Sequence, residues 1–298
     1  MTTLSECLAK MSAILPLECT IETTLLDDGF LNNVYLLSWN GAPQWVLRIP
    51  YEKSELFHIH RAEELRVLNC AAEQGIAPVV VWQESETGCV VSQFVMQPSL
   101  DWSVCHGDSD IIRLAQALVR FHALPAGQHS YSVFDVIKGY LQRIEEGIVE
   151  NESLKKEYDY LVSMFQQMTL PERLLPSVLC HNDVNPKNVL MDNEHLWLID
   201  YEYAGFGDPL FDLALVAQSH NLDPRQTRLL LSSYGVDFSS GGLLAAIDHY
   251  KIAYGMREMA WMLLKSAITP QDNKAFASYL AFKDSPSLNP FLLNKGNA

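Results

Sequence analysis

The sequence predicts an α+β fold with two lobes, in which a small antiparallel sheet is followed by a larger, mainly helical part. In the first hundred residues, short runs rich in β-branched and aromatic side chains alternate with turn residues, which is typical of strands. From about residue 109 onward, apolar residues recur at helical spacing. The strand pattern breaks at 95–99 without a flexible spacer. We therefore expect a β-rich lobe at residues 1–97 and a helical lobe at residues 98–298.

The sheet is predicted to begin with a hairpin. Residues 34–39 and 45–49 are short β-rich runs, and the dipeptide Asn40-Gly41 between them forms tight hairpin turns. A helix is expected at 60–74, where apolar residues recur at helical spacing until Gly75 ends the pattern. Two further strands are expected at 79–83 and 89–95.

The second part is predicted to be helical apart from one isolated hairpin. In 110–123, the apolar residues Ile111, Leu114 and Leu118 share one helical face. Two short apolar runs joined by Asn193-Glu194 predict the hairpin. The expected hairpin strands are 189–192 and 196–200, and the expected helical stretches are 110–123, 135–168, 208–220, 224–234, 241–267 and 271–281.

The composition narrows the class of function. The chain has 21 Lys+Arg against 36 Asp+Glu, a net charge of −15, which argues against a nucleic-acid partner because phosphate backbones bind basic patches. A small cationic substrate would suit this charge, although an acidic surface also serves solubility alone. The six cysteines include no C-x-x-C pair, so neither a zinc site nor a disulfide scaffold is indicated.

The sequence also bears on location. The N-terminus has no basic leader before an apolar run, and no stretch of about 18 consecutive apolar residues occurs. We therefore expect a cytoplasmic protein without a membrane partner. The pattern does not encode an oligomeric state.

The clearest chemical motif is the string H-x-D-x-x-x-x-N at 181–188, followed by the predicted hairpin that ends at Asp200. Phosphoryl transfer from ATP needs an in-line hydroxyl, a group that accepts its proton, and Mg²⁺ to spread the phosphate charge. Asp183 is placed to accept the proton, whereas Asn188 and Asp200 offer oxygen ligands to Mg²⁺. The tight hairpin explains how the chain returns from Asn188 to the same site at Asp200.

A second block of residues carries a family resemblance. The segment 198–214 reads L-I-D-Y-E-Y-A-G-F-G-D-P-L-F-D-L-A. It resembles the D-[WFY]-E-[YF]-A-G-x-G-D-x-x-x-D-L-A block of bacterial choline kinases and thiamine kinases, in the aminoglycoside phosphotransferase and choline kinase superfamily. The helix at 114–122 is similar to the L-A-x-x-L-x-x-L-H helix of these enzymes. The resemblance implies a two-lobed, protein-kinase-like fold, although protein kinases carry Asp-Phe-Gly at this point.

The same resemblance implies a nucleotide site in the first lobe. Arg48, in the strand at 45–49, takes the place of the lysine that holds ATP phosphates in protein kinases, and its planar fork suits phosphate oxygens. Glu64 would form an ion pair with Arg48, with Glu63 as the alternative. The implied site is completed by Gly29 and Asn32 in a degenerate phosphate loop and by backbone groups of Gln93, Phe94 and Val95 opposite adenine.

Other residues have both a functional and a structural interpretation. His181 resembles the histidine that packs below the catalytic loop, and Asp212 resembles a buried carboxylate that braces this loop. Glu202 either gives a carboxylate to a cationic substrate or forms an ion pair with a nearby helix. Tyr254 and Trp261 lie on an aromatic stripe of the helix at 241–267, which forms either plain core or a cage that binds a cationic substrate through cation–π attraction.

Together, the motif and the resemblance predict an ATP- and Mg²⁺-dependent kinase that phosphorylates a small cationic alcohol, with choline first and thiamine second. Ethanolamine, homoserine, a methylthio-sugar and an aminoglycoside are the alternative acceptors. A pseudokinase-like module that binds a nucleotide without catalysis is the alternative from another class, and the presence of all three catalytic residues argues against it. A protein kinase is disfavoured because the chain has neither Asp-Phe-Gly nor Ala-Pro-Glu.

Overall fold

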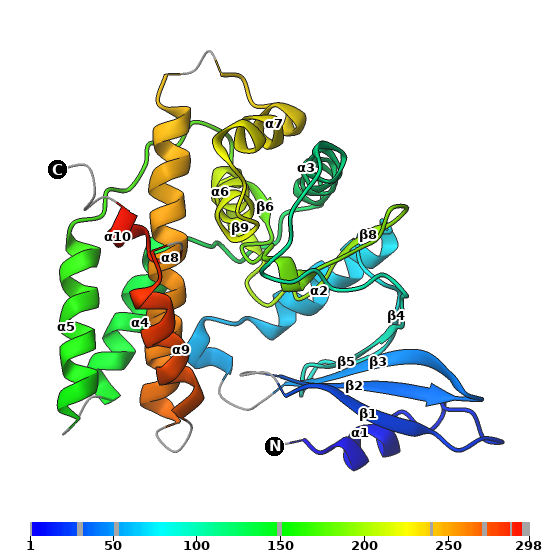
Figure 1. Ribbon diagram of the computed structural model, residues 1–298. Helices are drawn as coiled ribbons and strands as arrows, with labels where there is room; N and C mark the ends of the chain where they lie inside the picture. The colour runs from blue at the N-terminus through cyan, green and yellow to red at the C-terminus, as the bar shows by residue number, and fades with distance from the viewer. Residues whose placement is uncertain are drawn as a thin grey trace.

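In the computed structural model, the chain combines a five-stranded antiparallel sheet with a larger group of helices (Figure 1). The structure describes residues 2–28, 32–50, 54–147, 151–238, 241–269, 273–286 and 288–293. The predicted α+β class, with its sheet near the N-terminus, is confirmed. The strands of the sheet lie in the order β1-β2-β3-β5-β4, with the bounds β1 Glu22–Asp28, β2 Asn32–Trp39, β3 Ala42–Pro50, β5 Cys89–Gln93 and β4 Val80–Glu84.

The central hairpin of the sheet forms where the sequence predicts it. β2 pairs with β3 as far as Trp39 opposite Ala42. The two residues between them, Asn40 and Gly41, have φ angles of 56° and 73°. Positive φ at both positions gives the turn whose twist matches that of the paired strands, and Asn-Gly is the dipeptide that adopts it most readily. The register shifts at a β-bulge between Leu37 and Ser38, and beyond it Arg48 of β3 lies opposite Val34.

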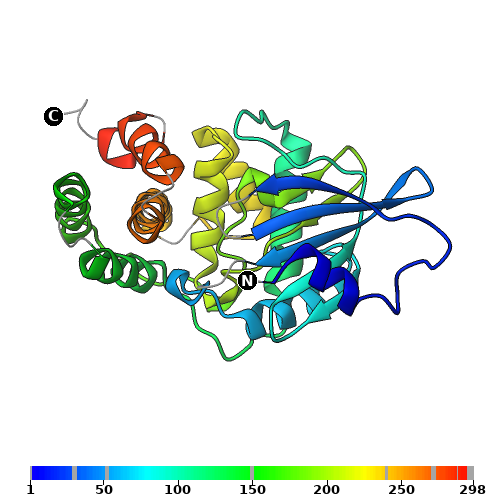
Figure 2. The same ribbon diagram turned by 90° about the horizontal axis from the view of Figure 1, so that it is seen from below.

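A small hydrophobic core lies against the sheet. α1 (Leu4–Lys10) lies across one face of it (Figure 2), and a capping box between Thr3 and Glu6 closes the start of this helix. The sequence did not predict α1, because seven residues give too short a periodic pattern. The core comprises Cys7, Met11, Leu37, Leu47, Ile49, Cys89 and Val91.

α2 (Arg61–Glu73) follows the predicted range but joins the larger core of the molecule. Leu65, Leu68 and Ala71 are buried in the same cluster as apolar residues of the C-terminal helices. Gly75, just beyond the helix, has a φ angle of 62°, a conformation that glycine adopts without strain. α2 is therefore fixed relative to the helical part, and its acidic residues are fixed with it.

The helical part is organised around α8, a helix of 26 residues from Leu243 to Ile268. α8 packs against α4, α6 and α9 (Figure 1). The predicted helical stretch at 135–168 contains two helices, α4 and α5, which contact each other. Across the described ranges, the structure has no helix long and apolar enough to cross a lipid bilayer. The remaining bounds are η1 Ser54–Phe57, α3 Asp108–His122, α4 Val133–Gly147, α5 Glu152–Gln166, α6 Pro209–Ser219, α7 Pro224–Tyr234, α9 Asn273–Asp284 and α10 Pro290–Leu293.

Two small sheets carry the segments that contain the motif residues. The segments 181–188 and 199–204 lie between the strands of these two sheets. At one end Cys180 pairs with Gly205, and at the other end Val189 pairs with Leu198. The hairpin β7–β8 was predicted, whereas β6 and β9 were not, because strands of three residues give no periodic signal. The pairs are β6 (Val178–Cys180) with β9 (Gly205–Gly207), and β7 (Val189–Met191) with β8 (Leu196–Leu198).

Candidate active site

The segment 181–188 forms a loop that ends in a short 3-10 turn, η2 (Pro186–Asn188). Asn185 caps this turn by accepting a hydrogen bond from a backbone N–H at 2.9 Å. The turn brings Asn188 back to Asp183, because Nδ2 of Asn188 donates to Oδ2 of Asp183 at 2.8 Å and to its carbonyl oxygen at 2.9 Å. The two motif residues are therefore in direct contact, and the amide oxygen of Asn188 is the atom left to face a cation.

Asp200 joins these two residues through the β7–β8 hairpin. The backbone N–H of Ile199 donates to the carbonyl oxygen of Asn188 at 3.0 Å, so the chain returns beside η2. Asp200 has a φ angle of 65°, a left-handed conformation that aspartate adopts more readily than most residues do. Its carboxylate lies near enough to Asp183 for the two charges to interact. The structure thus brings Asp183, Asn188 and Asp200 into one site.

Arg48 of β3 forms an ion pair with Glu64 of α2, and both side chains are largely buried. Glu63 instead pairs with Arg66 on its own helix at 2.7 Å, so Glu64 rather than Glu63 is the partner of Arg48. Nη1 of Arg48 also lies 3.5 Å from Oδ1 of Asp200. Burial would lower the pKa of Arg48, but Glu64 and the neighbouring carboxylates raise it above its ordinary value. Arg48 is therefore a fixed cation between the sheet and the motif segments.

Three carboxylates gather around Arg48. One oxygen from each of Glu64, Asp200 and Glu202 lies within 4.8 Å of the others. Burial raises the pKa of Asp200 well above its ordinary value, and the charges of Glu202 and Glu64 add to the rise while Arg48 opposes it. A divalent cation would relieve this concentration of negative charge, and carboxylate and amide oxygens are ligands that Mg²⁺ prefers. The side chain of Asp200 therefore fits the predicted Mg²⁺ site, and Asn188 as the second ligand stays a prediction.

Glu202 is a buried ion-pair partner of α2. Its Oε1 accepts hydrogen bonds from Nη1 of Arg61 at 2.7 Å and from Nδ2 of Asn32 at 2.8 Å. Burial would raise the pKa of Glu202, but Arg61 and Arg48 lower it below its ordinary value. Because Arg61 and Arg48 pair with its carboxylate, the geometry favours the ion-pair interpretation of Glu202, and its contact with a substrate stays a prediction. Asn32 is likewise bound to Glu202, and its contact with phosphate stays a prediction.

Asp212 of α6 holds the backbone at the start of the motif loop. Its carboxylate is fully buried and accepts hydrogen bonds from the backbone N–H groups of His181 at 2.8 Å and Asn182 at 2.7 Å. Nε2 of His122 donates a third hydrogen bond at 2.9 Å. Burial would raise the pKa of Asp212, but the hydrogen bond and charge of His122 lower it below its ordinary value. Asp212 thus holds the backbone at the start of the loop through the N–H groups of His181 and Asn182.

His181 packs beneath the same loop. Its Nδ1 accepts a hydrogen bond from the backbone N–H of Asp183 at 3.3 Å, and its Nε2 donates to the carbonyl oxygen of Ile199 at 3.1 Å. Burial lowers the pKa of His181, so the ring is neutral and can both accept and donate. His181 therefore joins the segment that carries Asp183 to the segment that carries Asp200.

The aromatic stripe of α8 surrounds a cation of the chain itself. The guanidinium of Arg257 lies 5.4 Å from the ring centroids of both Tyr203 and Tyr254, and 5.7 Å from that of Phe211. Nη2 of Arg257 donates to Oδ1 of Asp183 at 2.7 Å. The ring of Tyr254 thus packs on Arg257, and its place in a substrate cage stays a prediction.

Trp261 packs as a core side chain. Its ring centroid lies 5.5 Å from that of Phe57, and it borders the main hydrophobic core. Trp261 thus has the contacts of a side chain at the edge of the core, and its place in a substrate cage stays a prediction. Sequence reasoning missed Arg257, although one signal was present: Arg257-Glu258 is the only charged pair in the otherwise apolar run 252–264. A charge on a buried helix face requires a partner.

The predicted adenine-facing segment follows β5. The backbone N–H of Gln93 donates to the carbonyl of Val79 and that of Phe94 to the carbonyl of Gln44, each at 2.8 Å. These two donors are therefore committed to the sheet region, and Val95 is the member of the segment whose N–H remains for adenine. Gly29 lies outside the described residues. The adenine and phosphate contacts stay predictions.

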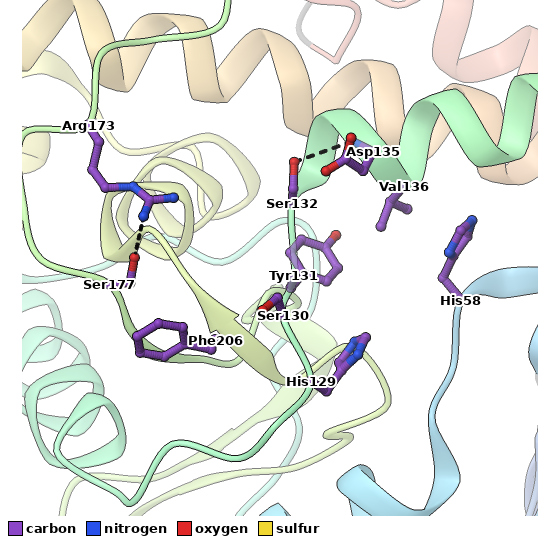
Figure 3. A pocket seen from close by; sticks show the side chains of 10 residues that line it. All are labelled: His58, His129, Ser130, Tyr131, Ser132, Asp135, Val136, Arg173, Ser177 and Phe206. Atoms are coloured by element: carbon purple, nitrogen blue, oxygen red, sulfur yellow. Dashed lines mark hydrogen bonds between the residues drawn. The ribbon is translucent and has the colours of Figure 1, made fainter.

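A cavity of about 370 Å³ lies apart from the motif residues (Figure 3). Asp183, Asn188 and Asp200 do not line it. Tyr131 connects it with the site, because its hydroxyl oxygen accepts a hydrogen bond from Nη1 of Arg257 at 3.2 Å. The cavity is lined by His58, His129, Ser130, Tyr131, Ser132, Asp135, Val136, Arg173, Ser177 and Phe206.

Known proteins resemble this chain in sequence and in fold. Protein LicA of Haemophilus influenzae (strain Rd) is 31% identical over 207 residues, which are 68% of this chain and 76% of that protein. Ethanolamine kinase 1 of Mus musculus is 27% identical over 215 residues, which are 66% of this chain and 57% of that protein, less than two thirds of its length. The solved structure of choline kinase LicA from Streptococcus pneumoniae superposes with a TM-score of 0.69 at 21% identity, covering 93% of this chain and 99% of that one.

The family match extends across most of the chain. The model of the phosphotransferase enzyme family matches residues 22–248, a range that contains the sheet, Arg48 and the whole of the motif loop. This range and the resemblance of the block at 198–214 point to the same group of proteins. The chain therefore belongs to the phosphotransferase enzyme family, and LicA of Haemophilus influenzae is one of its relatives.

Proposed function

We propose that this protein transfers the γ-phosphoryl group of ATP to the hydroxyl group of a small cationic alcohol, with choline as the first candidate. The observation that supports this most directly is the contact between Asp183 and Asn188, beside Asp200 and Arg48. A base, two oxygen ligands for a metal ion and a fixed cation are the parts that phosphoryl transfer requires. The activity of the relatives named above agrees with the proposal.

Each residue of the site has a role in the proposed reaction. Asp183 orients the acceptor hydroxyl and takes its proton as the oxygen attacks the γ-phosphorus. Arg48 holds phosphate oxygens, and its ion pair with Glu64 keeps the guanidinium in place. Asn188 and Asp200 would hold Mg²⁺, which when bound spreads the negative charge of the phosphate oxygens. The residues thus position the reactants and stabilise charge without forming a covalent intermediate.

The acceptor is proposed to be cationic because of the charge of the site. The chain carries a net charge of −15, which attracts small cations. Glu258 and Asp183 both accept hydrogen bonds from Nη2 of Arg257. The side chain of Glu258 is 27% exposed. Oε1 of Glu258 accepts hydrogen bonds from Arg257, so the second carboxylate oxygen of Glu258 is the atom that would approach an acceptor nitrogen.

Ethanolamine is the second candidate acceptor, and one observation favours it. The rings of Tyr203, Phe211 and Tyr254 already enclose the guanidinium of Arg257. A trimethylammonium group depends on such rings, because it has no N–H to donate. A primary ammonium can instead donate hydrogen bonds to a carboxylate such as that of Glu258.

The test is a coupled assay of ADP release with Mg²⁺ and ATP. The acceptors are choline, ethanolamine, thiamine, homoserine and kanamycin, each at the same concentration, with the Asp183→Ala protein as the blank. We expect turnover that depends on Asp183 with choline or ethanolamine. ATP and Mg²⁺ binding without Asp183-dependent turnover on any of the acceptors would contradict the proposal and favour a nucleotide-binding module.

A further inference from the structure

Arg257 lies in the middle of α8, and only 2% of the residue is exposed. Arginine stays charged in proteins, so a buried guanidinium requires acceptors for its five N–H groups. Each of the five donors has one. Nε and Nη2 donate to Oε1 of Glu258 at 3.1 and 2.9 Å. Nη1 donates to Tyr131 and to the carbonyl oxygen of Asn182, and Nη2 also donates to Asp183.

The rings around Arg257 come from three separate segments. Tyr203 follows Asp200, Phe211 belongs to α6, and Tyr254 lies one turn earlier on α8. Cation–π attraction is stronger when the cation is removed from water, as it is here. The guanidinium is therefore fixed relative to the whole site and not only to its own helix.

Arg257 also holds the peptide that precedes Asp183. Asn182 has a φ angle of 63°, a left-handed conformation uncommon for residues other than glycine. The carboxylate of Asp212 accepts a hydrogen bond from the backbone N–H of Asn182 at 2.7 Å. Arg257 donates a hydrogen bond to the carbonyl oxygen of Asn182. Two buried groups of opposite charge thus clamp the left-handed residue from both sides.

The carboxylate of Asp183 is bound at both of its oxygens. Oδ2 accepts hydrogen bonds from Asn188 at 2.8 Å and Asn185 at 3.2 Å. Oδ1 accepts the hydrogen bond from Arg257 at 2.7 Å. Without Arg257, Oδ1 would lose this restraint and the carboxylate would be free to turn about its side-chain bonds.

We propose that Arg257 is a positioning residue for phosphoryl transfer. It holds the carboxylate of Asp183, and the left-handed peptide before it, in the orientation that receives the proton of the acceptor hydroxyl. This inference rests on the proposed function. The planar fork of arginine is required, because the compact ammonium of lysine reaches one of these acceptors but not the set of them.

The experiment compares Arg257→Lys and Arg257→Ala with the wild-type enzyme, using the acceptor that the panel identifies. For Arg257→Ala we expect kcat to fall about 100-fold, the effect of a misplaced reacting group, while KM for ATP changes less than about twofold. For Arg257→Lys we expect a fall in kcat of about tenfold, because the charge is kept and the geometry is lost. Arg225→Lys is the matched control, because Arg225 pairs with Asp108 at the surface.

A rescue experiment separates positioning from folding. Methylguanidinium at millimolar concentration should restore part of kcat to Arg257→Ala, while the wild-type enzyme and Arg225→Lys stay unchanged. Wild-type kcat in a folded Arg257→Lys protein would overturn the inference. Loss of the folded state in both variants, measured by circular dichroism, would also overturn it and assign Arg257 to stability alone. A wild-type enzyme that turns over no acceptor would remove the proposed function, and this inference with it.

Discussion

Nδ2 of Asn188 donates a hydrogen bond to Oδ2 of Asp183 at 2.8 Å, so a proposed metal ligand also orients the proposed base. Asn188→Ala removes both functions together. We expect kcat to fall by at least about 100-fold, as for the loss of a positioned catalytic group, and the Mg²⁺ concentration for half-maximal rate to rise. Steady-state kinetics over a Mg²⁺ series measures both. Asn193→Ala, in an exposed turn, is the control, and equal Mg²⁺ dependence in the two variants would contradict the dual role.

Asp200 is the charged member of the proposed Mg²⁺ site. Burial and the neighbouring carboxylates raise the pKa of Asp200, so its charged form is unfavourable unless a cation binds it. Replacement by alanine removes this carboxylate. We expect Asp200→Ala to lose the gain in nucleotide affinity that Mg²⁺ gives the wild-type protein, while metal-free nucleotide binding persists. Isothermal titration with ATP, with and without Mg²⁺, measures this difference. Asp159→Ala, at an exposed ion pair, should keep it.

Glu202 stabilises the contact between the motif segment and α2. Glu202→Gln removes a carboxylate that pairs with both Arg61 and Arg48, and leaves Glu64 as the close charged partner of the two guanidinium groups. We expect the free energy of unfolding to fall by about 2 kcal/mol, because a buried hydrogen bond to a charged group is weakened while Glu64 still offsets the positive charge. Urea denaturation measures the fall, with Glu194→Gln at the surface as control. A stable Glu202→Gln protein with a raised KM for the acceptor alone would contradict this structural role and favour Glu202 as a substrate ligand.

His220 makes the folded protein sensitive to acid. Burial and the adjacent His106 lower the pKa of His220 to about 3, below its ordinary value of 6.5. The folded state therefore binds the proton more weakly than the unfolded state. Stability is complete above about pH 6.5 and falls as the pH drops from there toward 3, by about 1.4 kcal/mol for each pH unit.

Denaturation midpoints between pH 7.5 and 5 test this dependence. His220→Gln should flatten the loss of stability, because the amide can accept the hydrogen bond of His106 and has no proton to gain. His195→Gln, at the surface, should leave the slope as it is in the wild type. Identical slopes for His220→Gln and the wild type would show that other groups set the sensitivity to acid.

Much of the fold could be predicted because its signals are local. The hairpin at Asn40-Gly41 depends on two residues that favour positive φ, and α2 depends on a periodic pattern ended by a glycine. The elements that were missed are those too short to show a period, such as α1 and the strands β6 and β9. The break between α4 and α5 was not predicted, because the apolar residues recur at helical spacing before it and after it.

The site could be predicted where the residues lie close in sequence. Asp183 and Asn188 are five positions apart, and one hairpin returns the chain to Asp200. For Glu202 and Tyr254 the substrate and structural interpretations both stayed open, because their partners, Arg61 and Arg257, come from distant segments. Which carboxylate pairs with which cation in the core depends on how the helices rotate and pack. A single sequence does not determine that packing.

The most direct test of the central role of Asp183 is phosphorus NMR of a reaction that contains ATP, Mg²⁺ and choline or ethanolamine, with wild-type and Asp183→Asn proteins at equal concentration. Asp183→Asn keeps the shape of the side chain but removes the proton acceptor. We predict that the wild type produces ADP and a phosphomonoester of the alcohol, and that the variant does so about 100 to 10,000 times more slowly. Formation of the ester by Asp183→Asn at the wild-type rate would contradict the assignment of Asp183 as the base.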